Sequence, residues 1–236
     1  SGLLRRALAR VEPNAPVTVL LCAAALAARV AEDRRPGTTV AWLSAWPLSA
    51  WRHDEPRSWV RLVSHAVGHF SWEHLLGNVS TLLLVCPLLE DEYGSAALLA
   101  THVSAAASAA VAHMYLGPER TALAGASSLV FASTLLASFG GRRRLANGKG
   151  EGRVPLTTLL TVLLVCFREV ALANKPIAGA SQPGEDNKDA VYRSALAHAV
   201  GGVVGCAAGL ALRPRAARRA KWEASFDTVA SGKKWK

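Results

Sequence analysis

Three separated apolar segments of the chain carry polar side chains that could perform hydrolysis. These side chains are His65, His69, His74, Asn78, Ser127 and His198. Polar groups in apolar surroundings cost several kcal/mol unless they are partnered, so their presence there indicates function. A serine hydroxyl, an imidazole that takes its proton and N–H donors for the developing oxyanion are the groups of a serine hydrolase. The combination predicts a serine hydrolase that works within the bilayer.

The roles follow from the residue types and their spacing. Ser127 is the expected nucleophile and His198 the base, and because no acidic residue lies near His198 in sequence, a dyad is favoured over a triad. His74 and Asn78 are spaced i and i+4 on one side of a helix and are the expected oxyanion donors.

A metal site is the weaker interpretation of the first histidine cluster. His65, His69 and His74 would have to converge from spacings of four and five, and no cysteine or nearby carboxylate completes a closed ligand set. We therefore expect no metal and no cofactor.

The segments that position these residues are long enough to cross a membrane. The chain has 236 residues, of which 51% are hydrophobic. Apolar runs that could cover about 30 Å of hydrocarbon fall at 15–31, 71–89, 95–116, 121–139, 156–173 and 191–212. The sequence predicts an all-α integral membrane protein with a bundle of six transmembrane helices. The run 15–31 contains Arg29 and the run 95–116 is rich in alanine, so either could be a buried or tilted helix.

Basic residues are distributed unequally between the two faces that six crossings would create. One face receives the N-terminus, the segment 140–154 and the tail after 212, with 16 basic residues, whereas the opposite face holds nine, diluted by acids. The positive-inside rule predicts both termini in the cytosol, matrix or stroma, and the arginine-rich start favours a mitochondrial inner membrane over a bacterial one. The basic residues flank apolar spans and follow no recognition motif, so anionic lipids are the expected partner and nucleic acid is not.

Residues that act together must lie at one depth in the membrane. If helices begin near residues 71, 121 and 191 on the same face, Asn78, Ser127 and His198 all lie roughly 9–10 Å below it, and His74 about 5 Å. Gly201 and Gly205 form a small-residue strip that would let the last helix approach the fourth closely. Gly125 leaves room for backbone near the nucleophile.

The remaining segments divide the chain into a basic N-terminal part (1–14), the membrane domain (15–212) and a basic tail (213–236). Five of the seven tryptophans lie in or beside residues 32–70, which predicts short helices at the membrane interface. The tail, with Trp222 and Phe226, is expected to contact lipid or another subunit. His102 and His113 are expected to be packing or interface histidines.

The motifs together resemble the rhomboid family of intramembrane serine proteases. The resemblance covers about 59–209 and is carried by Arg61, His65, His69, His74, Asn78, Glu90, Gly125, Ser127, His198, Gly201 and Gly205. It implies a six-helix core in which Ser127 and His198 form the dyad, His74 and Asn78 donate to the oxyanion, and Arg61, His65, His69 and Glu90 shape or brace loop and helix ends. The chain has Ser128 where the family usually has the last glycine of Gly-x-Ser-Gly, and Trp59-Val60-Arg61 where it has Trp-Arg.

Three functions fit these observations. The leading one is a protease that cleaves transmembrane protein substrates. The second is a catalytically inactive rhomboid-like structural subunit of a larger membrane complex, which Ser128, the basic aromatic tail and the charged pair Arg168-Glu169 inside an apolar run would favour. A transporter or channel lined by the histidines has less support, because the small-residue contacts imply a tightly packed centre.

Overall fold

The computed structural model describes residues 14–144, 156–172 and 186–212, and every regular element in these ranges is a helix. In chain order they are α2 (Pro16–Arg34), α3 (Thr38–Trp42), η1 (Leu48–Ala50), α4 (Pro56–Ser64), η2 (His65–Val67), α5 (Trp72–Tyr93), α6 (Ser95–Leu116), α7 (Ser127–Arg144), α8 (Leu156–Leu172) and α9 (Asn187–Ala211). The prediction of an all-α protein is confirmed. The predicted basic segment 1–14, the basic loop 140–154 and the tail 213–236 lie wholly or largely outside the described residues.

The long helices α5 and α6 begin and end at residues suited to those positions. Ser71 precedes α5 in an extended conformation, and its hydroxyl accepts the His74 N–H at 3.2 Å, which satisfies one of the free donors of the first turn. α5 ends at Tyr93, the following Gly94 has a φ of 94° that favours glycine, and α6 starts at Ser95. The two helices therefore form a tight hairpin.

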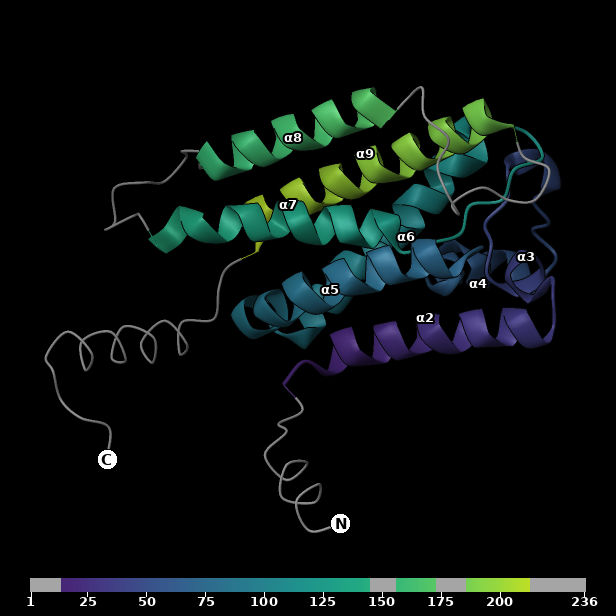
Figure 1. Cartoon of the computed structure of the whole chain (residues 1–236), viewed down its shortest axis with the longest axis horizontal. Coiled ribbons are helices and arrows are strands. Elements are labelled where there is room, and N and C mark those ends of the chain that lie inside the picture. Colours follow the sequence, from purple (N-terminus) through teal and green to yellow (C-terminus); the bar gives the residue numbers. More distant parts are fainter. Residues whose placement is uncertain (1–13, 145–155, 173–185, 213–236) are drawn as a thin grey trace, which may run out of the picture.

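The long helices lie side by side, with α2 and α8 at opposite edges and the short α3 and α4 at one end (Figure 1). α7 packs most extensively against α9, and α2 packs on α5. α5 and α7 run in the same direction, because His74 lies against Gly125 and Cys86 contacts Ser133 further along both helices. α6 runs in the opposite direction.

Small residues of α6 allow the helices to pack closely at the centre of the bundle. Ala105, Ala106, Ala109 and Ala110 are all 0–1% exposed, and the first two join a core cluster with Leu82 and Leu129. The alanine-rich segment that was predicted as a possible buried helix is the most enclosed of the long apolar helices described. Alanine thus serves helix contact here, as small residues do in membrane bundles.

Three described helices are long and apolar enough to cross a membrane: Trp72–Tyr93, Ser95–Leu116 and Lys188–Ala211. The apolar part of α7, Ser127–Ser138, is shorter. The six predicted spans all correspond to helices, although the number that cross a bilayer remains a prediction. The predicted short helices between the first two spans are present as α3, η1, α4 and η2.

Candidate active site

Ser127 is the first residue of α7, so the predicted helix start near residue 121 is wrong. Residues 121–126 form a non-helical segment in which every residue is buried. Gly125 has φ of 129°, which a right-handed helix excludes and which favours glycine. The backbone therefore enters the bundle as a loop, and the helix begins at the candidate nucleophile.

Backbone hydrogen bonds fix this loop at several points. Leu123 and Ala45 exchange two N–H to carbonyl bonds of 2.8 and 2.9 Å. The Gly125 N–H donates to the His65 carbonyl at 2.9 Å. His113 Nε2 donates to the Thr121 carbonyl at 3.1 Å, so His113 is a packing histidine that holds this loop against α6. A loop held by so many partners presents Ser127 in a fixed position.

His69 is the centre of a hydrogen-bond network behind the loop. Its Nδ1 lies 3.2 Å from the Val67 carbonyl oxygen, which can only accept, so Nδ1 carries the proton and Nε2 is an acceptor. Nε2 accepts the Asn78 side-chain amide at 3.0 Å and the Ala126 N–H at 3.3 Å. Burial lowers the pKa of His69 from 6.5 to about 4, which keeps the ring neutral at physiological pH.

The two predicted oxyanion donors lie beside this network. The His74 ring packs edge to face on His69 with ring centroids 5.1 Å apart. It also fills the space next to Gly125, where an added Cβ would lie 2.5 Å from His74 Cε1. Gly125 therefore makes room for an imidazole ring, whereas we expected it to make room for backbone. Asn78 uses its amide to reach His69, and an amide NH₂ group has a second N–H to donate.

His198 lies on α9 at the level where α7 begins. The residue is 8% exposed, and its ring stacks on Phe131 with centroids 4.0 Å apart and planes 6° apart. His198 Nε2 lies 3.3 Å from Ser194 Oγ, one turn earlier on the same helix. Phe131 is one turn after Ser127, so this ring connects the two helices next to both candidate catalytic residues.

Glycines on α9 set the distance between α9 and α7. A Cβ added at Gly201 would lie 2.2 Å from the Ser128 carbonyl oxygen, and one added at Gly205 would lie 2.3 Å from the Ala132 carbonyl oxygen. The pairing advances by four residues on both helices, so α7 and α9 are parallel. His198, three residues before Gly201, is therefore beside the start of α7.

This register corrects the basis of the depth prediction. α9 begins at Asn187, four residues earlier than predicted, so His198 lies roughly 16 Å along its helix while Ser127 lies at the start of its own. Distances counted from helix starts would separate the two residues. The buried loop 121–126 removes that difference by carrying Ser127 into the bundle before α7 begins.

The other predicted supporting residues connect elements around the site. His65 is fully buried, and its Nε2 donates to the Ala106 carbonyl at 3.0 Å, which ties η2 to α6. The Arg61 guanidinium donates to the Ala41 carbonyl and ties α4 to the end of α3. The Glu90 carboxylate accepts the Val17 and Thr18 N–H groups at 2.9 and 3.1 Å and thereby caps α2.

Ser128, the residue after the candidate nucleophile, is buried. The residue is 1% exposed, and its hydroxyl has no hydrogen-bond partner among the described residues. Its carbonyl oxygen faces Gly201. The serine at this position is thus accommodated inside the α7–α9 contact, where an unpaired buried hydroxyl costs about 1–3 kcal/mol.

Sequence reasoning missed two features of the site. Because a longer helix was expected, the N–H groups of Ser127 and Ser128 were not recognised as first-turn donors, which have no partner within a helix. The Gly117-Pro118 pair and Gly125 were the available signals for a later helix start. The ring of Phe131 was also missed, since its position one turn after Ser127 becomes meaningful only when α9 is placed.

The helices and this site together define a polytopic membrane protein with a polar centre inside its bundle. The family model for the rhomboid domain matches residues 56–215, which is more than half of the chain. The protein therefore belongs to the rhomboid family, a family that contains serine intramembrane proteases, and is an integral membrane protein. A comparison with curated proteins found no match to the chain.

Proposed function

We propose that this rhomboid-family protein is an intramembrane serine protease with Ser127 as nucleophile and His198 as general base. The observation that carries the proposal is the parallel contact of α7 and α9, in which Gly201 abuts the Ser128 carbonyl and the Phe131 ring stacks on His198. This contact supports a position for the imidazole beside the first residue of α7, where a serine hydroxyl needs a base to become nucleophilic.

In the proposed reaction a transmembrane substrate unwinds locally and presents a peptide carbonyl to Ser127 Oγ. His198 takes the hydroxyl proton as the oxygen attacks and returns it to the leaving amine, which leaves an acyl ester on Ser127. Water, deprotonated by the same imidazole, then releases the carboxylate product.

The oxyanion of the tetrahedral intermediate needs fixed N–H donors. The free amide N–H of Asn78, the His74 ring and the backbone N–H of Ser127 at the start of α7 are the proposed donors. Loss of one such donor costs about 10²–10³ in rate in other hydrolases. The hydrogen bonds of His69 to Asn78 and Ala126 support this arrangement, since they fix two of the neighbouring groups before substrate arrives.

We propose that the protein is a bundle of six membrane-spanning helices in the mitochondrial inner membrane, with both termini on the side that carries more basic residues. The unequal distribution of basic residues supports this orientation. Substrates would be transmembrane proteins that reach the site from the lipid.

Purified protein incubated with a fluorophosphonate probe, and separately with a model transmembrane substrate, tests the proposal. Wild-type protein and the Ser128→Ala control should be labelled and should cleave, because the Ser128 hydroxyl has no role in the proposed reaction. The Ser127→Ala variant should do neither. Labelling that survives in Ser127→Ala would show that another residue reacts, and an inert wild-type protein would favour the structural-subunit function.

A further inference from the structure

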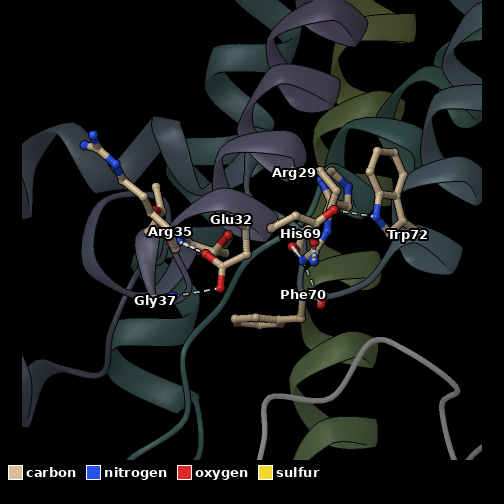
Figure 2. A network of polar contacts seen from close by, with 10 residues as sticks. Arg29, Glu32, Arg35, Gly37, His69, Phe70 and Trp72 are labelled. Atoms are coloured by element: carbon tan, nitrogen blue, oxygen red, sulfur yellow. Dashed lines mark hydrogen bonds and ion pairs between the residues drawn. The ribbon is translucent and has the colours of Figure 1, made fainter.

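Arg29 is a charged residue in the C-terminal half of α2, and it reaches the segment that leads to the candidate active site. Its side chain is 11% exposed, and α2 precedes the matched rhomboid domain. Arg29 Nη1 donates to the carbonyl oxygens of His69 and Phe70 at 3.2 and 3.0 Å (Figure 2). These carbonyls belong to the non-helical turn immediately before α5.

Asp33 and Trp72 complete the contact from the other side. The second amino group of Arg29 donates to Asp33 Oδ1, and Asp33 Oδ2 accepts the Trp72 indole N–H at 2.8 Å. The Arg29 guanidinium also lies 6.0 Å from the centre of the Trp72 ring. We call Arg29, Asp33 and Trp72 the Arg29 clamp, because together they hold residues 69–72 against α2.

The clamped segment carries the His69 ring. Arg29 fixes the His69 backbone, while the ring nitrogen Nε2 accepts from Asn78 and from the Ala126 N–H, directly before Ser127. The ring has no freedom to compensate for a backbone shift, since its Nδ1 is bound to the Val67 carbonyl and its face meets His74. A displacement of the turn would therefore move the acceptor to which both Asn78 and the loop are bonded.

We propose that Arg29 is a positioning residue for the candidate active site, acting through the turn at residues 69–72 and the His69 ring on Asn78 and Ala126. The catalytic part of this inference rests on the proposed function. The structural part, that Arg29 holds the Ala126 N–H through His69, does not.

The chemistry of the contact requires arginine specifically. A planar guanidinium offers donors in two directions at once, which serves two carbonyls and a carboxylate together. Lysine places a single ammonium group on a flexible chain and cannot bridge these acceptors with the same geometry. Arg29→Lys should therefore recover only part of what Arg29→Gln loses.

Two other contacts of α2 provide matched controls. Glu32, three residues from Arg29, accepts the Gly37 and Thr39 N–H groups at 2.9 and 2.6 Å, and Figure 2 shows the bond to Gly37. Thr18, at the opposite end of the helix, donates to Glu90 at 2.9 Å. Thr18→Val weakens an α2 contact far from the Arg29 clamp, whereas Glu32→Gln keeps every hydrogen bond of the clamp and removes only a neighbouring charge.

Amide hydrogen exchange of the detergent-solubilised full chain, followed by mass spectrometry, is the first measurement. In Arg29→Gln, exchange should accelerate about tenfold or more in peptides that cover residues 66–72 and also in those that cover 121–127. Arg29→Lys should give a smaller acceleration, and the two controls should leave 121–127 unchanged. Exchange over 121–127 that is the same in Arg29→Gln as in wild type would overturn the proposal, whether or not the protein is a protease.

Substrate cleavage is the second measurement. A positioning role predicts that kcat falls by about 10–10² while KM changes less than threefold, because the misplaced groups act in the transition state. If Arg29→Gln fails to fold, Trp72→Phe keeps an aromatic ring but removes the indole N–H that donates to Asp33 and reduces the ring beside Arg29, so it should show the same pattern at smaller size. If Arg29→Gln exchanges faster over 121–127 but keeps the kcat of an active wild-type enzyme, the catalytic part of the proposal is refuted and the structural part stands. A wild-type protein that neither labels nor cleaves would refute the proposed function. In that case the exchange measurement still decides the structural part.

Discussion

Replacement of Gly201 by alanine tests whether the contact between α7 and α9 sets the geometry of the candidate active site. An added methyl carbon would lie 2.2 Å from the Ser128 carbonyl oxygen and 2.8 Å from the Ser128 Cα. An ordinary carbon–oxygen contact is about 3.3 Å or longer. Since both neighbours are backbone atoms and cannot rotate away, the two helices must separate by about 1 Å at this point.

The expected effects follow from that displacement. Overpacking a well-packed contact costs about 1–3 kcal/mol of stability. His198 lies three residues before Gly201 and would move with α9 relative to Ser127 and Phe131. Misplacement of a reacting group by about 1 Å can reduce a rate by about 10²-fold. We therefore expect Gly201→Ala to lower both the unfolding temperature and kcat/KM. The fall in kcat/KM should be far larger than the fall in the fraction of folded protein.

Gly202→Ala is the matched control. At this neighbouring glycine of the same helix, an added Cβ would meet only Leu135 Cδ1, at 3.6 Å, among the described residues, which is an ordinary van der Waals contact. Thermal unfolding in detergent, fluorophosphonate labelling and cleavage of a transmembrane substrate should be measured for wild type and both variants. Gly202→Ala should remain within about 0.5 kcal/mol and twofold of wild type.

Two results would refute the reasoning. Gly201→Ala with wild-type stability and activity would mean that α7 and α9 are not in backbone contact at Ser128. Equal impairment of Gly201→Ala and Gly202→Ala would mean that α9 tolerates no added methyl group, so that the contact with Ser128 is not the cause.

Further predictions concern the buried groups around the site. Ser128→Ala should raise stability by about 1 kcal/mol, because it removes a buried hydroxyl without a partner among the described residues, and thermal unfolding checks this. Gly125→Ala should lower activity by at least about tenfold, since φ of 129° disfavours any side chain and the new Cβ would lie 2.5 Å from His74 Cε1; probe labelling measures it. Burial lowers the pKa of His65 and of His69 from 6.5 to about 4, so the unfolded chain binds these protons first and stability should fall as pH drops from about 6.5 towards 4, by at most about 3 kcal/mol for each ring. Unfolding temperatures that stay constant between pH 6.5 and 4.5 would contradict the last prediction.

The helical content of the protein could be predicted from sequence because it depends on local pattern. Apolar runs with few charges predicted all six long helices, and the extents of all but α7 agree with prediction to within four residues at each end. Ser71 before α5 and Gly94 after it are local signals for a helix start and a helix end. The rhomboid family was also recognisable, since its motifs are read residue by residue along the chain.

The start of α7 could not be predicted because it is decided by distant partners. Residues 121–126 are apolar and short-chained enough to continue a helix, yet their backbone groups bond to Ala45, His65 and His69. These partners lie more than 50 residues earlier in the chain. Only after α5 and η2 are in place does the loop gain more from those bonds than from another helical turn.

The sequence by itself determined which polar groups enter the apolar bundle: the histidines, Asn78 and Ser127 are placed there by the runs that contain them. Tertiary structure alone decided what each group faces. His69 became the acceptor for Asn78 and Ala126, His113 a brace for the loop, and Arg29 a donor to the turn before α5. The physical reason is that apolar periodicity is a property of neighbouring residues, whereas a buried hydrogen bond requires two groups that only the packed helices bring within about 3 Å.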